Sequence, residues 1–271
     1  MARMRAAVLV ATLAAVGVAA QPFDAAQSTP TFTTAVDVVT VNVTVTGRDG
    51  RVVSGLRKDD FSVFEDGRRR DIVYFEDEST PVSLGILLDA SGSMGDNRGV
   101  KLNLARDLIS TLVTRDLEAT TEWMFARFTS TVVVAQEWTT DRAAIVQPLR
   151  ETRATGNTSL YDAIALSIPL VQEGHFGKKA LLVVSDEAET TSLVTREEAL
   201  REIGAHDVRV HMVDVRKDAA GEMARVAEAL RHQYLVGYST NVPADGGRHA
   251  IRVDVRARGA SVSARRELSR S

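Results

Sequence analysis

Two aspartates and three hydroxyl residues stand where a metal ion could be bound. Asp89, Ser91 and Ser93 form a D-x-S-x-S pattern directly after an apolar run. Thr158 lies in a second loop, and Asp186 follows another apolar run. Because carboxylate and hydroxyl oxygens are ligands of hard cations, this set predicts a site for Mg²⁺, Mn²⁺ or Ca²⁺ that uses neither Cys nor His.

The elements around these residues indicate why they should meet. Residues 84–88 and 181–184 are continuous apolar runs, as found in central parallel strands that are covered on both faces. In an open α/β sheet, ligands bind beyond the carboxyl ends of the strands. We therefore expect the loops that carry the aspartates and hydroxyls to gather at one edge of the sheet.

The rest of the middle alternates strands with amphipathic helices. Residues 123–128 and 132–135 predict a hairpin toward an edge, and residues 208–215 predict an edge strand that is exposed or otherwise covered. Thr195 and Glu198 form a capping box. Helices are expected over residues 102–113, 141–149, 160–171, 195–204 and around 223–230. The prediction is a doubly wound α/β domain with a mostly parallel sheet of about five strands.

The segment before this domain is rich in predicted strands. Alternating valines with polar residues between them predict a half-buried strand, the valines being Val39, Val41, Val43 and Val45. Residues 47–50 predict a turn and residues 51–53 a return. Residues 61–64 and 72–75 are expected to form a second hairpin around the Asp66-Gly67 turn.

The segment after the domain has a similar character. Residues 234–238, 250–255 and 261–267 predict three more short strands. Neither flank is long enough to bury much core alone, so we expect the two flanks to pair into one small β-sandwich.

The N-terminus has the pattern of a signal peptide. Arg3 and Arg5 precede an apolar, alanine-rich stretch that ends in small residues before Gln21. The alternative, an uncleaved anchor, is disfavoured because the stretch is shorter than the roughly 20 apolar residues that span a bilayer. The protein is therefore expected to be exported, periplasmic or secreted, with no membrane span after signal removal. The predicted segments are 1–20 signal peptide, 21–34 tether, 35–80 N-terminal β segment, 81–232 α/β domain and 233–271 C-terminal β segment.

Composition narrows the function classes. Lys and Arg total 33 against 36 Asp and Glu, a net charge of −3, so the chain lacks the basic surface that nucleic-acid binding needs. Cysteine is absent, which excludes disulfide scaffolds, cysteine zinc sites and thiol nucleophiles. The composition does not specify an oligomeric state.

The motifs resemble those of von Willebrand factor type A domains. The segment GILLDASGSM at residues 85–94 is similar to the metal-ion-dependent adhesion site (MIDAS) of that family. GNTSLYDA at residues 156–163 resembles its threonine loop, and LVVSD at residues 182–186 resembles the strand with its second aspartate. The resemblance covers about residues 81–232. The flanks, at residues 55–67 and 233–238, resemble a bacterial exported subfamily.

The resemblance implies a role for each matched residue. Ser91, Ser93 and Thr158 would bind the metal through hydroxyl oxygens, and Asp89 and Asp186 would act largely through bound waters. Such a site leaves the ion able to take a carboxylate from an Asp or Glu of a protein partner. The implied activity is adhesion, without enzymatic turnover.

Two departures from the family pattern stand out. Glu187 follows the second aspartate where the family usually has glycine, and Glu189 is close by, so either could occupy the open metal position in the resting protein. The segment after residue 215 also looks short, as though one helix and the sixth strand of the sheet were missing.

Two other interpretations of the motif remain open. A metal that only braces the three loops would make the domain a structural module. A serine hydrolase is a weaker alternative, because G-x-S-x-G is absent around Ser91 and Ser93 and no His falls in a loop assigned to the same edge.

Overall fold

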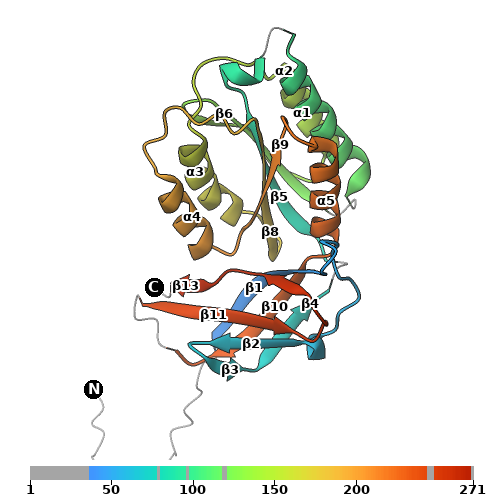
Figure 1. Ribbon diagram of the computed structural model, residues 1–271, viewed down its shortest axis with the longest axis vertical. Helices are drawn as coiled ribbons and strands as arrows, with labels where there is room; N and C mark the ends of the chain where they lie inside the picture. The colour runs from blue at the N-terminus through green and yellow to red at the C-terminus, as the bar shows by residue number, and fades with distance from the viewer. Residues whose placement is uncertain (1–36, 78–79, 96–97, 118–120, 243–246, 270–271) are drawn as a thin grey trace, which may run out of the picture. The chain divides into compact units, whose positions relative to one another are not determined.

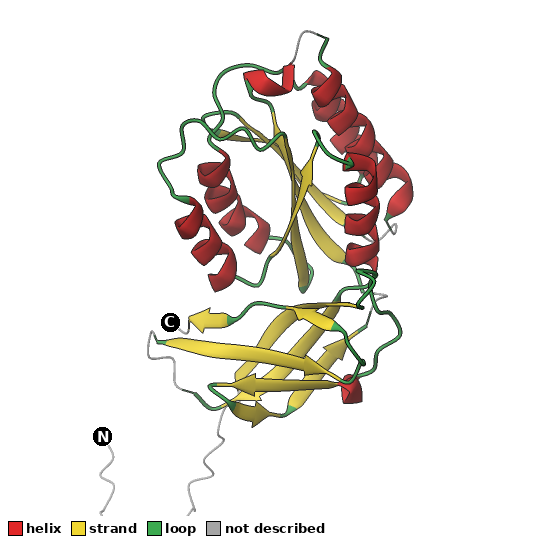
Figure 2. Cartoon of the chain, in the orientation of Figure 1, coloured by secondary structure: helices red, strands yellow, loops and turns green. Residues whose placement is uncertain are grey.

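The computed structural model describes residues 37–77, 80–95, 98–117, 121–242 and 247–269. The predicted signal peptide and tether lie outside these residues. In the described part the strands form three sheets, of which one belongs to an α/β unit and two belong to a β-sandwich (Figures 1 and 2).

The α/β sheet has the order β7-β6-β5-β8-β9. Its strands are β5 (Val82–Asp89), β6 (Glu122–Phe128), β7 (Val132–Thr139), β8 (Lys178–Ser185) and β9 (Arg209–Asp214). All neighbouring pairs are parallel except β6 and β7, which are antiparallel. The predicted fold class, with five strands and β9 at an edge, is confirmed.

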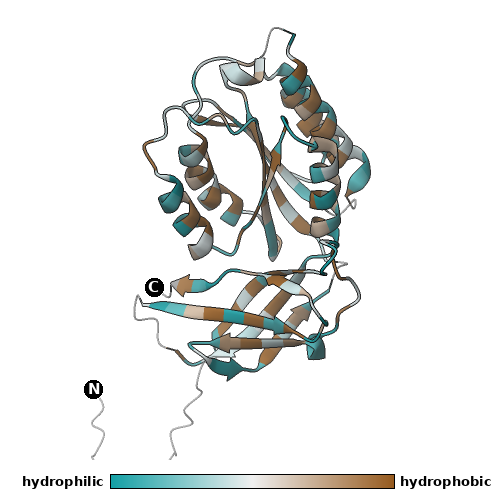
Figure 3. Ribbon diagram, viewed as in Figure 1, coloured by the Kyte–Doolittle hydropathy of each residue, from teal (hydrophilic) through white to brown (hydrophobic). Residues whose placement is uncertain are grey.

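Helices cover both faces of this sheet (Figure 1). They are α1 (Val100–Thr111), α2 (Arg142–Glu151), α3 (Leu160–Gln172), α4 (Arg196–Ala205) and α5 (Ala219–Arg231), with the short 3₁₀ helix η2 (Gly92–Gly95) and the π-helical segment η3 (Leu112–Asp116). Helices α1, α2 and α5 pack on one face, and α3 and α4 on the other. Each carries hydrophobic residues along one side and hydrophilic residues along the other (Figure 3). None of the helices in the described residues is both long and apolar enough to span a bilayer.

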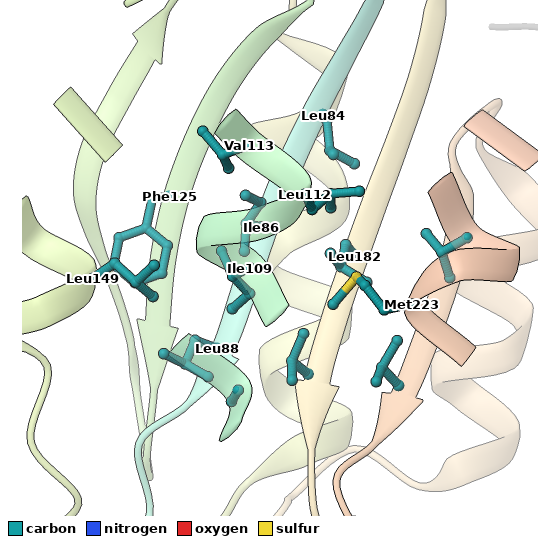
Figure 4. Packing of buried hydrophobic residues seen from close by; sticks show 14 of the residues in the cluster. Leu84, Ile86, Leu88, Ile109, Leu112, Val113, Phe125, Leu149, Leu182 and Met223 are labelled. Atoms are coloured by element: carbon teal, nitrogen blue, oxygen red, sulfur yellow. The ribbon is translucent and has the colours of Figure 1, made fainter. Parts of the chain in front are cut away.

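The central strands divide their side chains between two cores because side chains alternate along a strand. Leu84, Ile86 and Leu88 of β5 point toward α1 and its neighbours, where they meet Ile109 (Figure 4). Leu87 belongs to the opposite core, which includes α3. Burial on both faces explains why β5 and β8 read as continuous apolar runs.

The β-sandwich consists of two four-stranded sheets, and its strand pairs are antiparallel. One sheet has the order β12 (Ser261–Ser263), β1 (Asp37–Thr46), β10 (Tyr234–Thr240) and β4 (Ile72–Glu76). The other has the order β13 (Glu267–Ser269), β11 (Arg248–Val255), β2 (Phe61–Glu65) and β3 (Arg68–Arg70), with the turn η1 (Lys58–Asp60) before β2. The two flanks of the chain therefore pair with each other, as the fold-class prediction states.

Two local expectations were wrong. The Asp66-Gly67 turn joins β2 to β3, whereas β4 crosses to the other sheet and pairs with β10. The segment 261–267 is two short strands, β12 and β13, in different sheets. The expected return at 51–53 is present, as an antiparallel bridge between Thr46 and Val52 and a hydrogen bond from the Val53 amide to the Val45 carbonyl at 2.8 Å. A turn motif fixes a local reversal of the chain, but it does not decide which sheet the next strand joins.

The polar face of β1 is more buried than a half-exposed strand would be. Asn42 is completely buried, and its side-chain amide donates hydrogen bonds to the Asp207 carboxylate at 2.9 Å and to the Asp207 carbonyl at 3.1 Å. The Asn42 side-chain oxygen accepts a hydrogen bond from Gln233 at 2.8 Å. These contacts satisfy the amide, so a polar side chain is tolerated there.

Helix α3, which begins just after Thr158, lies very close to β5. A Cβ built on Gly85 would lie 2.6 Å from Cγ2 of Val171, closer than real carbon atoms approach. We expect Gly85→Ala to push α3 from the sheet and to lower the free energy of unfolding by about 1–3 kcal/mol.

Urea denaturation of a double-mutant cycle checks this. Val171→Ala alone should cost about 2 kcal/mol through the cavity it leaves. Because that cavity makes room for the new methyl group, the double mutant should lose clearly less stability than the sum of the single losses. Additive losses would show that Gly85 and Val171 are not in steric conflict.

Candidate functional site

Asp89 ends β5 and is completely buried. One of its carboxylate oxygens accepts a hydrogen bond from the backbone amide of Ser91 at 2.9 Å, and the other accepts one from the Ser185 hydroxyl at 2.6 Å. These two donors fix the carboxylate at the carboxyl edge of the sheet, between β5 and β8.

The hydroxyls of the D-x-S-x-S loop connect this edge to the second aspartate, Asp186, through short contacts. The Ser91 and Ser93 hydroxyl oxygens are 3.0 Å apart, and the Ser93 hydroxyl donates to the Asp186 carboxylate at 3.0 Å. Four of the five predicted residues are thus joined in one network, because Asp89 also bonds the Ser91 amide.

The network contains a cation from the chain itself. The ammonium of Lys101, on the first turn of α1, lies 2.7 Å from an Asp186 carboxylate oxygen and 3.1 Å from the Ser93 carbonyl oxygen. The Lys101 side chain is 29% exposed, whereas that of Asp186 is 2% exposed. The ion pair is therefore partly shielded from solvent.

Thr158 lies in a neighbouring loop and makes no hydrogen bond to the other four residues. The loop is joined to theirs by backbone bonds, since Thr155 N–H donates to the Ala90 carbonyl at 2.8 Å and Gly92 N–H to the Gly156 carbonyl at 2.9 Å. The Thr158 side chain is buried, and within the described residues its hydroxyl has no hydrogen-bond partner. Its oxygen is free to accept a ligand.

The segment after Asp186 is tied to the Thr158 loop as well. The Thr158 carbonyl accepts bonds from the backbone amides of Thr190 and Thr191 at 3.0 and 3.1 Å. All three candidate loops are therefore held together by bonds that involve no metal.

Glu187 and Glu189, which could have blocked the site, are engaged elsewhere. The Glu187 carboxylate pairs with Arg216 at 3.2 Å and with Lys217 at 3.7 Å. The Glu189 carboxylate accepts from the Leu160 backbone amide at 2.8 Å and so caps the start of α3. Glu187 has φ of +54°, the left-handed region that glycine occupies without strain, which accounts for the glycine common at this position in the resembling family.

The two aspartates have opposite electrostatic environments. Burial raises the pKa of Asp89, against the hydrogen bonds from Ser185 and Ser91 and with a further rise from the charge of Asp186. Burial also acts to raise the pKa of Asp186, but the hydrogen bonds from Lys101, the Ala188 amide and Ser93 outweigh it, and the net shift is downward. Asp186 is thus held as an anion by Lys101.

Two members of this network were missed by sequence reasoning. Ser185 belongs to an expected loop, but nothing in its type marks it as the donor to Asp89. Lys101 lies on the helix after the motif, and only the direction of its side chain brings it to Asp186. The rule that ligands bind at the carboxyl edge could have flagged Ser185, whereas no sequence signal identifies Lys101.

The donor set fits a divalent ion of the hard class. It consists of two carboxylates and three hydroxyls, all oxygen, and the Lys101 ammonium already contacts one of the carboxylates, that of Asp186, and the neighbouring Ser93 backbone carbonyl. No group of three or more His, Asp or Glu side chains suited to a metal occurs in the described ranges. A cation here would therefore depend on the hydroxyls as much as on the carboxylates.

Comparison with solved structures returns several proteins of similar type. BatB from Bacteroides thetaiotaomicron is 24% identical with a TM-score of 0.42; the match covers 49% of this chain and 65% of BatB, slightly under two thirds of its length. The von Willebrand factor domain of the type V pili tip protein Mfa5 from Porphyromonas gingivalis is 17% identical with a TM-score of 0.39, over 44% of this chain and 43% of that one. A von Willebrand factor type A protein from Catenulispora acidiphila is 12% identical with a TM-score of 0.47, over 87% of this chain and 73% of that one.

No curated protein matches the sequence. The family model for the von Willebrand factor type A domain matches residues 84–189, a stretch that runs from β5 past β8 and holds all five candidate residues. Residues 84–189, within the α/β unit, therefore match the von Willebrand factor type A domain family.

Proposed function

We propose that the domain is a binding module that captures an acidic side chain of a protein partner with the help of a divalent cation. Asp89, Ser91, Ser93, Thr158 and Asp186 would hold the cation. When bound, Mg²⁺ or a similar ion would supply a coordination position that attracts a carboxylate more strongly than a neutral donor.

The observation that carries the proposal is the position of Lys101. The Lys101 ammonium contacts the Asp186 carboxylate and the Ser93 backbone carbonyl, so the oxygens at this edge already accommodate a positive charge. The hydroxyl of Thr158 has no partner within the described ranges and is available as a further donor. Von Willebrand factor type A domains mediate protein–protein interactions, which agrees with a binding role.

A purely bracing metal is less well supported. The backbone bonds from Thr155 to Ala90 and from Gly92 to Gly156 already hold the first two loops together. The amides of Thr190 and Thr191 do the same for the third. Because the loops are braced without an ion, an ion would add little to their arrangement.

Hydrolysis is also less well supported. Among the described residues, the Ser91 hydroxyl pairs with Ser93 and has no hydrogen bond to a histidine. A serine nucleophile needs an adjacent base, usually a histidine, to accept its proton. The hydroxyls are therefore better explained as ligands than as nucleophiles.

We also propose that the protein acts after export, in the periplasm or outside the cell. The proposal rests on the signal-peptide pattern of residues 1–20. A partner would then belong to the envelope or the surroundings of the cell.

The first prediction concerns metal binding. Titration calorimetry with Mg²⁺ and Mn²⁺ should detect one ion per chain, and chelation should lower the melting temperature by mass action. Asp89→Ala, and Ser91→Ala combined with Asp186→Ala, should weaken binding by about 10- to 100-fold, as loss of supporting groups does in other metal sites. Asp254→Asn, in the sandwich, is the control. Equal affinities in wild type and the Ser91/Asp186 variant would rule the site out.

The second prediction concerns Lys101. If its ammonium competes with the metal for Asp186, Lys101→Met should tighten Mn²⁺ binding by about tenfold, since a charge pair near a protein surface is worth on the order of 1–4 kcal/mol before screening. Lys217→Met is a matched control, because Lys217 pairs with Asp214 and Glu187 at the same edge and does not contact Asp186. Weaker binding in Lys101→Met, or an equal gain in the control, would contradict competition.

The third prediction concerns the partner. The protein should retain an envelope or culture-medium protein in Mg²⁺ and release it in chelator, and recovered chains should begin after residue 20. Thr158→Ala should reduce retention without lowering the melting temperature of the metal-free protein, because its hydroxyl makes no bond within the described residues. Retention that survives both chelator and Thr158→Ala would mean that recognition uses another face.

A further inference from the structure

A pocket of about 300 Å³ opens beside the candidate site, on the β6–β7 side of the sheet. Ala90, Arg127, Glu151, Arg153 and Thr155 are among the residues that line it. None of the residues implicated in metal binding lines it, so the pocket is a separate feature.

The pocket is nevertheless locked to that site by short backbone bonds. Ala90 is the residue between Asp89 and Ser91. Its amide donates to the Phe128 carbonyl at the end of β6, and its carbonyl accepts from Thr155, both at 2.8 Å. One wall of the pocket is therefore the same loop that positions Asp89 and Ser91.

The pocket carries two arginines that form no ion pair with any of the described residues. Arg127 is half-buried near the end of β6, and Arg153 is exposed just after α2. Within the described ranges neither guanidinium forms an ion pair or a hydrogen bond. The one carboxylate in the lining, Glu151, is hydrogen-bonded to Gln147 at 3.1 Å.

A third arginine, Arg106, senses the charge of Arg153. Burial lowers the pKa of Arg106, and the charge of Arg153 lowers it further, against a smaller rise from the charge of Asp107. Unpaired like charges held near one another weaken a fold instead of stabilising it. A ligand that supplies negative charge would offset this repulsion.

We propose that Arg127 and Arg153 bind a second carboxylate of the same protein partner, next to the one taken by the candidate metal site. This inference rests on the proposed function. Guanidinium groups recognise carboxylates through paired, charge-assisted hydrogen bonds. The ligand is therefore an acidic segment with two Asp or Glu residues, and a spacing of about one to three residues suits neighbouring pockets because an extended chain rises about 3.3 Å per residue.

Synthetic peptides test the spacing. Gly/Ser peptides with one Asp, or with two Asp separated by zero, one or two residues, are titrated into the ¹⁵N-labelled full chain in Mg²⁺ and in chelator, and affinities are taken from amide chemical shifts. At least one two-acid peptide should bind about fivefold more tightly than the one-acid peptide, the gain expected from a solvent-accessible charge-assisted contact.

Variants test whether the two arginines cause the higher affinity of the two-acid peptides. Arg127→Gln combined with Arg153→Gln should reduce the two-acid peptides to the affinity of the one-acid peptide and leave the one-acid peptide unchanged. Arg68→Gln combined with Arg69→Gln, exposed arginines of β3, removes the same charge from the sandwich and should preserve the gain. Melting temperatures measured for both variants separate a binding effect from unfolding.

The outcomes distinguish the two proposals. A gain that persists without Arg127 and Arg153, no gain for any spacing, or a gain only when the second acid is phosphoserine would overturn the carboxylate pocket. One-acid binding that is indifferent to chelator would overturn the metal-dependent function, while an arginine-dependent gain in the same titration would still support the pocket.

Discussion

The parallel pairing of β5 with β8 is the constraint on which the candidate site depends. The register sets Leu88 opposite Val184, so the two strands end together and release Asp89, Ser185 and Asp186 at one point of the sheet edge. The Ser185 hydroxyl then donates to Asp89 across the strands. Two carboxylates forced so close repel each other, and the ammonium of Lys101 offsets that repulsion.

Much of this arrangement could be predicted from sequence. The apolar runs of β5 and β8 and the helical periodicity between them predict the α/β sheet, because burial on two faces leaves a strong pattern. The carboxyl-edge rule then predicts that the candidate loops meet, although it does not give the distance from Thr158 to the other residues. In the sandwich the pattern was less informative. The crossing of β4 and the burial of Asn42 depend on contacts with residues distant in sequence, such as Asp207.

The directions in which the charged side chains near the site point could not be predicted from the sequence. Lys101, Glu187 and Glu189 are all charged residues near the site, and their types give no indication of which one reaches it. In the structure Glu187 pairs with Arg216, and Glu189 accepts a hydrogen bond at the start of α3. Lys101 pairs with Asp186. Long side chains have several accessible rotamers, so local packing determines which partners they contact.

The distribution of charge along the sheet edge is uneven. Asp214 is paired with Arg216 at 2.9 Å and Lys217 at 3.0 Å, and hydrogen bonding from Arg216 holds the pKa of Asp214 well below its usual range. Asp186 is likewise paired with Lys101. The β8–β9 side of the edge is thus internally neutralised, whereas Arg127 and Arg153 leave the β6–β7 side positive. Such a gradient would orient the proposed acidic segment before it makes contact.

The pairing of β1 with β10 has a consequence for the order of folding. Val41 pairs with Val236, nearly two hundred residues later in the chain, and the whole α/β unit lies between them. Closing so long a loop is entropically costly while the intervening chain is unfolded. Once the α/β unit has folded, the chain segments that lead from β4 into it and from it to β10 are held by a compact unit. The effective loop that must close to pair β1 with β10 is then short. The α/β unit should therefore fold first, with the valine face of β1 exposed until synthesis reaches β10. A nascent chain stalled before that point would present an unpaired strand edge, the kind of surface that chaperones shield.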